Sequence, residues 1–350
     1  MKLKRLLELE GGEVLAREIK TSDFHVVLPE GAVIRKEYIE RLKELGITEV
    51  YITEKNAETK EAAILKFDIE ISIKEKVKDI LERHTYHHNN ELIELNKAAD
   101  SIIAIILEED RVVEKVFDIR ERSTDIYEHS INVCSMAILT SLKLKINISK
   151  IHDIGVGCLL HDIGLRYTTA DFFNRDIDSL NQWDLIEYRK HPVYGYTSLK
   201  DEPWISELSK SIILNHHEKL NGFGFPLKEK SISMECQIVN VCDTFDEMIC
   251  GIACQKVKVH EAIENLKSVK NVLFDEKIVN AFLSFTAVYP AGTQVLTNEG
   301  ELAVVLSQNK NFQDRPVIRI LRDRHGNEVR GEIIKDLEKV NNIFIEKTID

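Results

Sequence analysis

Residues 215–226 read Asn-His-His-Glu-Lys-Leu-Asn-Gly-Phe-Gly-Phe-Pro. His216 and His217 supply two adjacent imidazoles, and neutral imidazole is the commonest metal ligand in proteins. The carboxylate of Glu218 follows at once, and the glycines and proline after it predict a tight backbone turn. Ligand side chains beside a rigid loop predict a metal site with a shaped wall.

Two His-Asp-Ile-Gly sequences, His152–Gly155 and His161–Gly164, begin nine residues apart. The second follows the apolar residues 156–160, which predict a helical turn that buries its last residues. A histidine-aspartate pair at the end of a buried helix is held rigidly, as a metal site requires. The first follows the polar residues 147–150, which are typical of a helix start, so we expect this first pair at the solvated surface.

The other histidines and aspartates with metal-ligand potential stand 25 to 32 residues apart along the chain. Each interval suits one helix and a connection, so successive helices of a bundle can direct ligands to one point. Imidazole nitrogens with carboxylate oxygens suit Fe, Mn, Ni or Zn at a hydrolytic centre. The predicted ligands are His129, His161, Asp162, His191, His216, His217 and Asp243.

Some of these residues have a second interpretation. Asp243 follows the apolar residues 238–242, where a buried unpaired carboxylate would be costly and a metal partner removes the cost. His191 precedes a proline and could instead mark a helix break. Asp125 stands four residues before His129 and shares its helix face, so it either extends the cage to a third metal or is an exposed helix carboxylate. The remaining histidines are expected at the surface: His25, His84, His87, His88, His260 and His325.

Composition excludes several classes of protein. The chain of 350 residues is too long for one ordinary domain, and its hydrophobic content of 43% is enough for a real core. The net charge of −12, with no basic run, argues against binding to DNA. No apolar stretch reaches the ~18–20 residues of a membrane span, and the charged N-terminus does not resemble a signal peptide. Six cysteines without a Cys-x-x-Cys pair predict buried free thiols in a cytoplasmic protein.

The composition and the hydrophobic periodicity of the sequence change along the chain and predict four segments. Residues 1–55 carry strand and helix signals typical of a small α/β unit. Residues 56–120 are charged, poor in glycine and proline, and periodic at helical spacing, so we expect long linking helices. Residues 121–288 keep the helical pattern, and residues 289–350 predict a small β-rich unit. The predicted fold class is therefore mainly α.

Short apolar runs bounded by turn residues predict the strands of the two flanking segments. In the first segment we expect strands at 25–28 and 47–52, and a helix at 36–45 that ends at Gly46. In the last segment we expect strands at 295–296, 302–306 and 317–321, with turns at 298–300 and 325–327.

The order of the predicted ligands, with Gly-Phe-Gly-Phe-Pro between His217 and Asp243, resembles the HD-GYP family. This family is a branch of the HD-domain metal-dependent phosphohydrolases, and the resemblance extends over residues 121–285. The flanking segments are similar to modules seen beside this domain. The resemblance implies an all-helical HD-type core that hydrolyses cyclic di-GMP to linear pGpG, with GMP as a further product left open.

The resemblance also implies roles for individual residues. The centre would hold two or three divalent ions, Fe or Mn, with Asp162 bridging two of them as a catalytic residue. Asp125 takes the place of a glutamate that helps to hold a third ion. Glu218 is a second candidate catalytic residue, which would orient a ligand histidine or the loop. Residues 221–226 correspond to the signature of the family and are called the signature loop. They supply the candidate substrate-binding residues Asn221, Gly222, Gly224, Phe225 and Pro226.

The chain departs from the family pattern where the family grips substrate phosphates. Leu165, Ile252 and Gln255 occupy positions that usually carry basic residues, and Asn221 and Phe225 replace an aspartate and a tyrosine. A charge-assisted hydrogen bond to phosphate contributes ~1.5–3 kcal/mol, so these losses weaken substrate binding unless other contacts replace them. Candidate replacements are Arg166, Arg175, Lys190 and Lys219.

Three functions remain open at this point. The complete ligand set favours a cyclic di-GMP phosphodiesterase. The altered phosphate contacts favour a phosphohydrolase for another cyclic dinucleotide or nucleotide, or a non-catalytic module that senses a nucleotide or docks a partner. The long helices of residues 56–120 could also support a homodimer.

Overall fold

The computed structural model describes residues 2–16, 18–20, 26–29, 31–45, 47, 49–53, 63–87, 90–108, 112, 115–119, 125–168, 172–173, 175–310 and 312–349. His25, Gly46 and His88 lie outside the described residues. The chain divides into a helical unit of residues 62–120 and 124–288, and a second unit of residues 1–61, 121–123 and 289–350. Residues 62–120, expected as linking helices, group with the helical unit.

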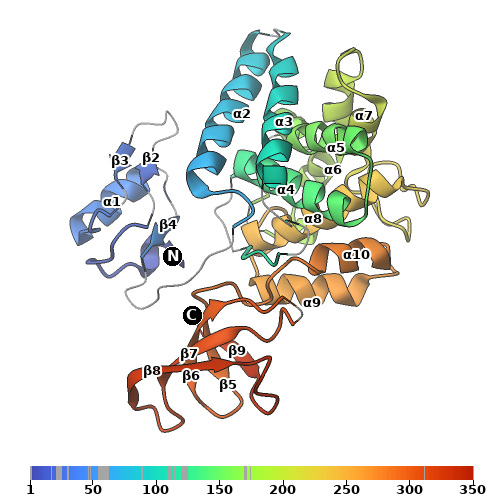
Figure 1. Ribbon diagram of the computed structural model, residues 1–350. Coiled ribbons are helices and arrows are strands. Elements are labelled where there is room, and N and C mark those ends of the chain that lie inside the picture. Colours follow the sequence, from blue (N-terminus) through green and yellow to red (C-terminus); the bar gives the residue numbers. More distant parts are fainter. Residues whose placement is uncertain are drawn as a thin grey trace. The chain divides into compact units, whose positions relative to one another are not determined.

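The helical unit is built around one large hydrophobic core. Its long helices pack side by side, with α4 against α5 and α8, and α5 against α7 (Figure 1). This arrangement confirms the predicted helical core. The helices are α2 (Phe67–His87), α3 (Glu94–Glu108), α4 (Ile126–Lys143), α5 (Ile148–Leu160), α6 (Gln182–Leu199), α7 (Glu207–Asn215), α8 (Met234–Cys250), α9 (Val259–Val269) and α10 (Glu276–Leu283), with the short 3-10 helices η2 (Asn90–Ile93), η4 (Ile163–Tyr167) and η5 (Ile177–Ser179).

Polar caps fix where the ligand-bearing helices begin. A side-chain oxygen just before each helix accepts backbone N–H groups of the first turn, which have no partner within the helix. These caps are Asp125 for α4, Asn147 for α5, Asn181 for α6, Ser206 for α7 and Ser233 for α8. Helix α8 ends at Gly251, whose φ of +79° is the left-handed conformation that glycine adopts without strain.

Close backbone packing joins the end of α5 to α6. Gly164 lies in η4, one turn after the second His-Asp pair, and a Cβ there would collide with the carbonyl oxygen of His191. Helix α6 continues through Pro192, so His191 does not mark a helix break. Its imidazole is fully buried.

The second unit contains a small core at each end of the chain. Near the N-terminus, β1 (Lys2–Arg5) pairs antiparallel with β4 (Glu49–Ile52), and β2 (Ile19–Lys20) pairs with β3 (Val26–Leu28). The short helix η1 (Leu6–Glu8) and α1 (Lys36–Glu44) complete this segment. The predicted helix and strands of this segment are confirmed within the described residues.

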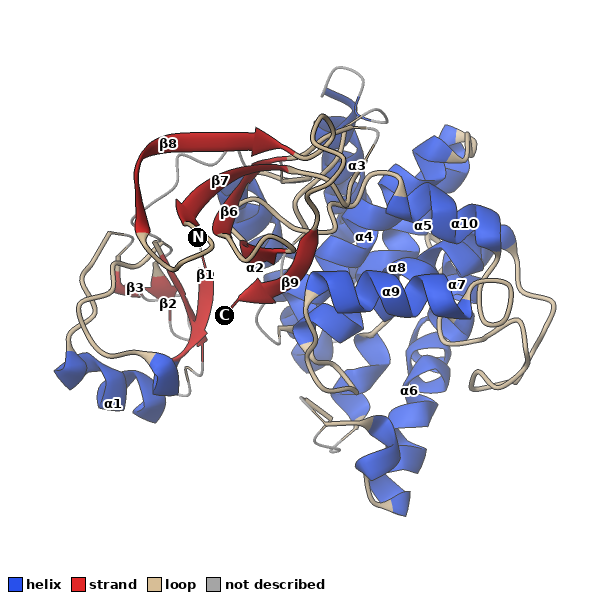
Figure 2. Ribbon diagram, turned by 90° about the horizontal axis from the view of Figure 1, so that it is seen from below, coloured by secondary structure: helices blue, strands red, loops and turns tan. Residues whose placement is uncertain are grey.

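The C-terminal segment is an antiparallel sheet with strand order β8-β7-β6-β5-β9. Figure 2 draws its strands in red and labels β6, β7, β8 and β9. Its strands are β5 (Gln294–Thr297), β6 (Leu302–Ser307), β7 (Val317–Arg322), β8 (Glu328–Asp336) and β9 (Ile345–Ile349). The predicted turns carry Gly300 and Gly326 at φ +79° and +81°. The predicted β-rich segment is confirmed, although the sequence indicated neither β8 nor β9.

Candidate metal centre

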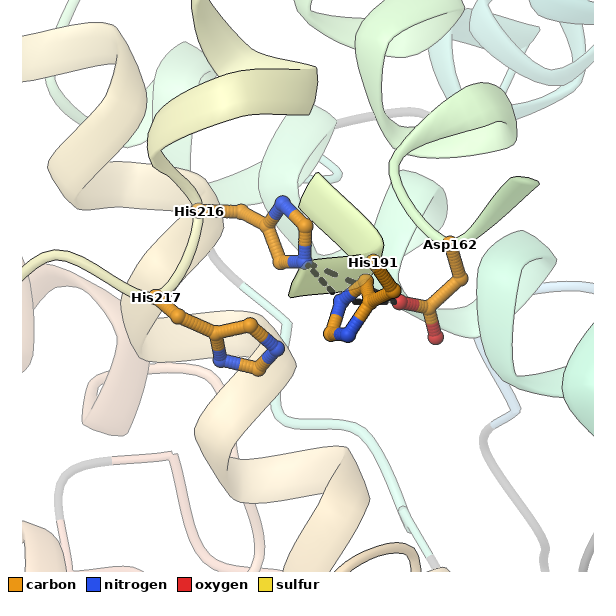
Figure 3. Close-up of side chains that lie close together, drawn as sticks. All are labelled: Asp162, His191, His216 and His217. Carbon is orange, nitrogen blue, oxygen red and sulfur yellow. Dashed lines mark hydrogen bonds and ion pairs between the residues drawn. The ribbon is translucent and has the colours of Figure 1, made fainter. Parts of the chain in front are cut away.

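Five successive helices each bring a predicted ligand to one buried point of the helical unit. His129 lies on α4 and Asp243 on α8, whereas the others lie on α6 or at the ends of α5 and α7. Their side chains are at most 8% exposed. Figure 3 shows four of them, Asp162, His191, His216 and His217, converging from different segments of the chain. The spacing of about one helix per ligand therefore predicts their convergence correctly.

Helix ends and a proline orient three of the histidines. The last carbonyl groups of a helix lack an N–H partner, and those of Cys158 and Ile213 accept the Nδ1–H of His161 at 2.7 Å and of His216 at 2.9 Å. Pro192 has no N–H for the carbonyl four residues earlier, so Tyr188 O accepts the Nδ1–H of His191 at 2.6 Å. A carbonyl oxygen can only accept, so each ring presents the Nε2 lone pair to the centre.

His129 lies inside α4, where the helix itself uses the neighbouring carbonyls. Its Nδ1–H points instead to Asp246, whose Oδ2 lies 2.9 Å away. Asp246 is three residues after Asp243 on α8 and is fully buried. The i,i+3 spacing, which puts two residues on one helix face, was the signal for this partner. The sequence interpretation missed it.

Asp162 faces two groups of ligands, one with each carboxylate oxygen. Oδ1 lies 3.3 Å from His191 Nε2 and 3.6 Å from His216 Nε2. Oδ2 lies 3.4 Å from His161 Nε2 and 3.6 Å from His129 Nε2. The ligand atoms form one group of Asp162, His191, His216 and His217, and another of His129, His161 and Asp243, each within 4.8 Å of one another. Each oxygen of Asp162 thus faces one of the two groups, and each group has donor atoms that suit a divalent cation.

The charges and lone pairs of this centre fit divalent cations. Nε2 of His191 and Nε2 of His216 are 3.0 Å apart, and those of His129 and His161 are 3.2 Å apart. Facing lone pairs at such distances repel one another unless a cation lies between them. Burial and the neighbouring His216 hold the pKa of His217 well below its usual value, so its ring is neutral and can coordinate.

The carboxylates are equally suited to cations. Burial alone would raise the pKa of Asp162, but His161 and the nearby imidazoles of His191 and His216 hold it well below its usual value. Asp162 is therefore ionised at neutral pH. Oδ2 of Asp243 is buried and has no hydrogen-bond partner among the described residues. An orphaned carboxylate oxygen is costly unless a cation accepts its lone pair.

Glu218 holds the signature loop instead of pointing at the ligand groups. Its Oε1 accepts the N–H of Leu227 at 2.5 Å and of Lys228 at 2.9 Å, and its Oε2 accepts that of Glu229 at 2.9 Å. This geometry corrects the prediction that Glu218 is catalytic, because both of its oxygens are directed to loop backbone. The alternative that it orients the loop agrees with these contacts.

The remaining loop residues form a rigid wall beside His217. Asn221 Oδ1 accepts the N–H of Phe223 at 3.0 Å, and Gly222 has a φ of +79°. A Cβ on Gly224 would collide with the backbone from His217 to Lys219. The Phe225 ring stacks on the His217 imidazole, with centroids 4.4 Å apart and planes at 27°, and precedes a cis peptide bond to Pro226.

The candidate ligand Asp125 and the His152–Asp153 pair, expected at the surface, lie outside the ligand groups. Asp125 Oδ1 accepts the N–H groups of Tyr127 and Glu128 at 3.0 Å, and its Oδ2 pairs with Lys74 Nζ at 2.6 Å. Its carboxylate is thus used as a helix cap and an ion pair, and the structure does not bring it to the centre. Asp153 and His152 are partly exposed on α5, where His152 Nε2 lies 3.4 Å from Asp100.

Three positions where the family resemblance implies basic residues carry Leu165, Ile252 and Gln255 in this chain. Leu165 and Ile252 are buried in the core, whereas Gln255 is exposed. Among the candidate replacements, Lys190 pairs with Glu187 at 3.1 Å, and Lys219 donates to Thr244 at 2.9 Å. Nη1 of Arg166 is buried and finds no hydrogen-bond partner within the described part of the chain.

Comparison with known proteins agrees with this geometry. Residues 112–278 match the family model of the HD domain, and residues 294–350 match that of a KOW domain associated with HD domains. A cyclic di-GMP phosphodiesterase of Pseudomonas aeruginosa is 28% identical over 224 residues, 63% of this chain and 54% of the relative. A cyclic di-GMP phosphodiesterase of Thermotoga maritima is 30% identical over 129 residues, 35% of this chain and 34% of the relative.

A solved structure shares the fold. An HDG"Y"P protein from Bdellovibrio bacteriovorus aligns with a TM-score of 0.56 at 20% identity, over 80% of this chain and 97% of that one. Residues 112–278 of the chain thus match the HD domain. The similarity to curated cyclic di-GMP phosphodiesterases agrees with the HD-GYP resemblance of its sequence. The chain spans about half or less of the length of the curated relatives named above.

Two further expectations concern the whole chain. Among the described helices, none is both long and apolar enough to span a bilayer. The six cysteines are free, and all but Cys254, which is partly exposed, are buried, as predicted.

Proposed function

We propose that this protein is a metal-dependent phosphodiesterase that hydrolyses cyclic di-GMP to pGpG. The observation that carries the proposal is the pair of buried ligand groups joined by the two oxygens of Asp162. The relatives from P. aeruginosa and T. maritima, both named cyclic di-GMP phosphodiesterases, support the substrate.

The residues divide the work of the centre. His191, His216 and His217 would hold one ion, and His129, His161 and Asp243 the other. Divalent ions held there, for which we favour Fe or Mn, would lower the pKa of a water and neutralise charge on phosphoryl oxygens. Asp246 and the three backbone carbonyls keep four rings in the tautomer that presents Nε2: those of His129, His161, His191 and His216.

The loop of residues 221–226 would form the substrate side of the site. Its rigidity comes from Glu218 and from the close backbone approach at Gly224. Phe225 packs on a ligand ring and supplies an apolar surface, whereas a tyrosine there would add a hydroxyl donor. The candidate substrate contacts are Asn221, Gly222, Gly224, Phe225 and Pro226.

A different cyclic dinucleotide is the second candidate substrate. The specific observation in its favour is that Leu165 and Ile252 are buried apolar side chains where the family pattern has cations. A cytoplasmic location and a homodimer through residues 56–120 also stay predictions. A light-scattering mass near the 40.2 kDa of one chain would contradict the homodimer.

Product analysis tests the proposal directly. Protein loaded anaerobically with Mn or Fe is incubated with cyclic di-GMP, cyclic di-AMP and cyclic GMP-AMP, and the products are separated by chromatography. We expect pGpG from cyclic di-GMP and slower turnover of the other two. Turnover of another dinucleotide alone would favour the second substrate. No turnover of any, with metals bound, would support a non-catalytic module.

A further inference from the structure

The carboxylate of Glu247 lies beside the proposed metal centre, although Glu247 is not among the ligands predicted from the sequence. It follows Asp243 by four residues on α8, so both side chains lie on the same face of the helix. Ligand atoms of Glu247, Asp243 and His217 lie within 4.8 Å of one another. This group shares His217 with one of the groups that Asp162 joins and Asp243 with the other.

Asp243 divides its oxygens between two directions. Oδ1 lies 3.1 Å from His129 Nε2 and 3.4 Å from His161 Nε2. Oδ2 lies 3.6 Å from His217 Nδ1, too far for a hydrogen bond. This second oxygen is buried, on a residue that is 1% exposed, and has no hydrogen-bond partner among the described residues. An orphaned anionic oxygen beside a second carboxylate indicates a missing cation.

The surroundings hold Glu247 in place. The hydroxyl of Tyr188 donates to its Oε1 at 3.0 Å. Burial and the carboxylate of Asp243 raise the pKa of Glu247 well above its usual range. The ammonium of Lys219 donates to Thr244 and lies 4.5 Å above the Phe274 ring. It acts on Asp243 and Glu247 through its charge, and no hydrogen bond joins it to either carboxylate among the described residues.

We propose that Glu247 is a metal ligand that forms a third cation subsite with Oδ2 of Asp243 and Nδ1 of His217. The inference rests on the proposed metal centre and reassigns one of its ligands, His217. His217 belongs to two ligand groups, and one ring normally serves one ion. The first group keeps Asp162, His191 and His216 without it, and three protein ligands are typical of an ion with an open position.

This assignment moves the third carboxylate to a different helix from the one that the sequence indicates. The family pattern implies Asp125, at the start of α4. Its two oxygens are already bonded to backbone N–H groups and to Lys74. Glu247 on α8 is the carboxylate that the structure directs to the ligands.

Metal counting on matched variants tests the inference. Wild type, Glu247→Gln and Asp125→Asn are loaded anaerobically with Mn, freed of excess metal and analysed for Mn per chain. Glutamine keeps an acceptor for Tyr188 but loses the charge. We expect three ions in wild type, two in Glu247→Gln and three in Asp125→Asn, with unchanged far-UV circular dichroism.

Several results would overturn it. Two ions in wild type, or three in Glu247→Gln, would contradict a third subsite at Glu247. Loss of one ion from Asp125→Asn but not from Glu247→Gln would indicate that Asp125, at the start of α4, holds the third ion. If Glu247→Gln does not fold, a count of two ions in wild type would still rule out the subsite. Wild type with two ions and cyclic di-GMP turnover would refute the inference and leave the proposed function intact. Fewer than two ions would count against both.

Discussion

His152 and His161 begin identical four-residue sequences, and their surroundings alone distinguish them. The Nε2 of His161 faces other ligand atoms, whereas the His152 ring is partly exposed beside Asp100. We expect His161→Ala or Asp162→Ala to abolish cyclic di-GMP turnover, because each removes a metal ligand. His152→Ala should leave kcat/KM close to the wild-type value, because its ring is partly exposed and lies outside the ligand groups. Equal losses in a turnover assay would mean that the wrong pair has been assigned.

Asp246 accepts the Nδ1–H of His129 and so holds this proposed metal ligand in the tautomer that presents Nε2. We expect Asp246→Asn to weaken metal affinity by roughly 10–100-fold, the usual effect of losing an outer partner of a ligand histidine. Competition with a chelating dye measures the affinity. Asp153→Asn, which neutralises a partly exposed aspartate outside the ligand groups, is the matched control. An unchanged affinity in Asp246→Asn would show that His129 needs no such partner.

At the scale of elements, the signature loop depends on the absence of a side chain at Gly224. A methyl group there would collide with the backbone of residues 217–219, and the loop would have to move. We expect Gly224→Ala to lower stability by about 1–3 kcal/mol, as overpacking does, and to raise KM for the substrate. Gly326→Ala, at a turn of the C-terminal sheet, should leave KM unchanged. Denaturation curves and steady-state kinetics measure the two effects, and wild-type values for both in Gly224→Ala would contradict this role of the loop.

The sequence predicts the helical character of residues 121–288 and the convergence of the candidate ligands, because about one helix separates successive ligands. Hydrophobic patterning locates the strands β5 to β7 but gives no bounds for the individual ligand-bearing helices. Asp246 and Glu247 leave no comparable signal, since acidic residues three and four positions after a ligand also occur on solvated faces. Asp125 shows the reverse difficulty: its i,i+4 spacing suits a ligand, but the same position is a good N-cap.

Histidine orientation lies between these cases. Pro192 and the ends of α5 and α7 are visible in the sequence, and each frees a carbonyl group. Which side chain accepts or donates there depends on packing, as the 2.6 Å hydrogen bond between His191 and Tyr188 illustrates. The contacts of Glu218 with residues 227–229 require the loop to fold back, which spacing does not predict.

At the scale of the whole molecule, bound metals should stabilise the helical unit much more than the flanking segments. The proposed ligands come from five helices, α4 to α8, so each ion ties distant parts of this unit together. Two ions at 100 times their Kd contribute about 2.7 kcal/mol each, and at about 2–4 °C per kcal/mol their removal should lower Tm by roughly 10–20 °C. Calorimetry with and without a chelator measures the shift. If the Tm of the helical unit does not change when the chelator is added, the result would argue against ions held by several helices.

Gly164 bears on how variant libraries of this protein are read. Its lack of a side chain lets the chain pass against the carbonyl of His191, and any substitution pushes that helix, with its imidazole, away from the centre. A saturation library selected for activity would therefore score position 164 as harshly as the ligands themselves. Intolerance in such a screen would not separate residues that hold an ion from residues that only leave room for their neighbours.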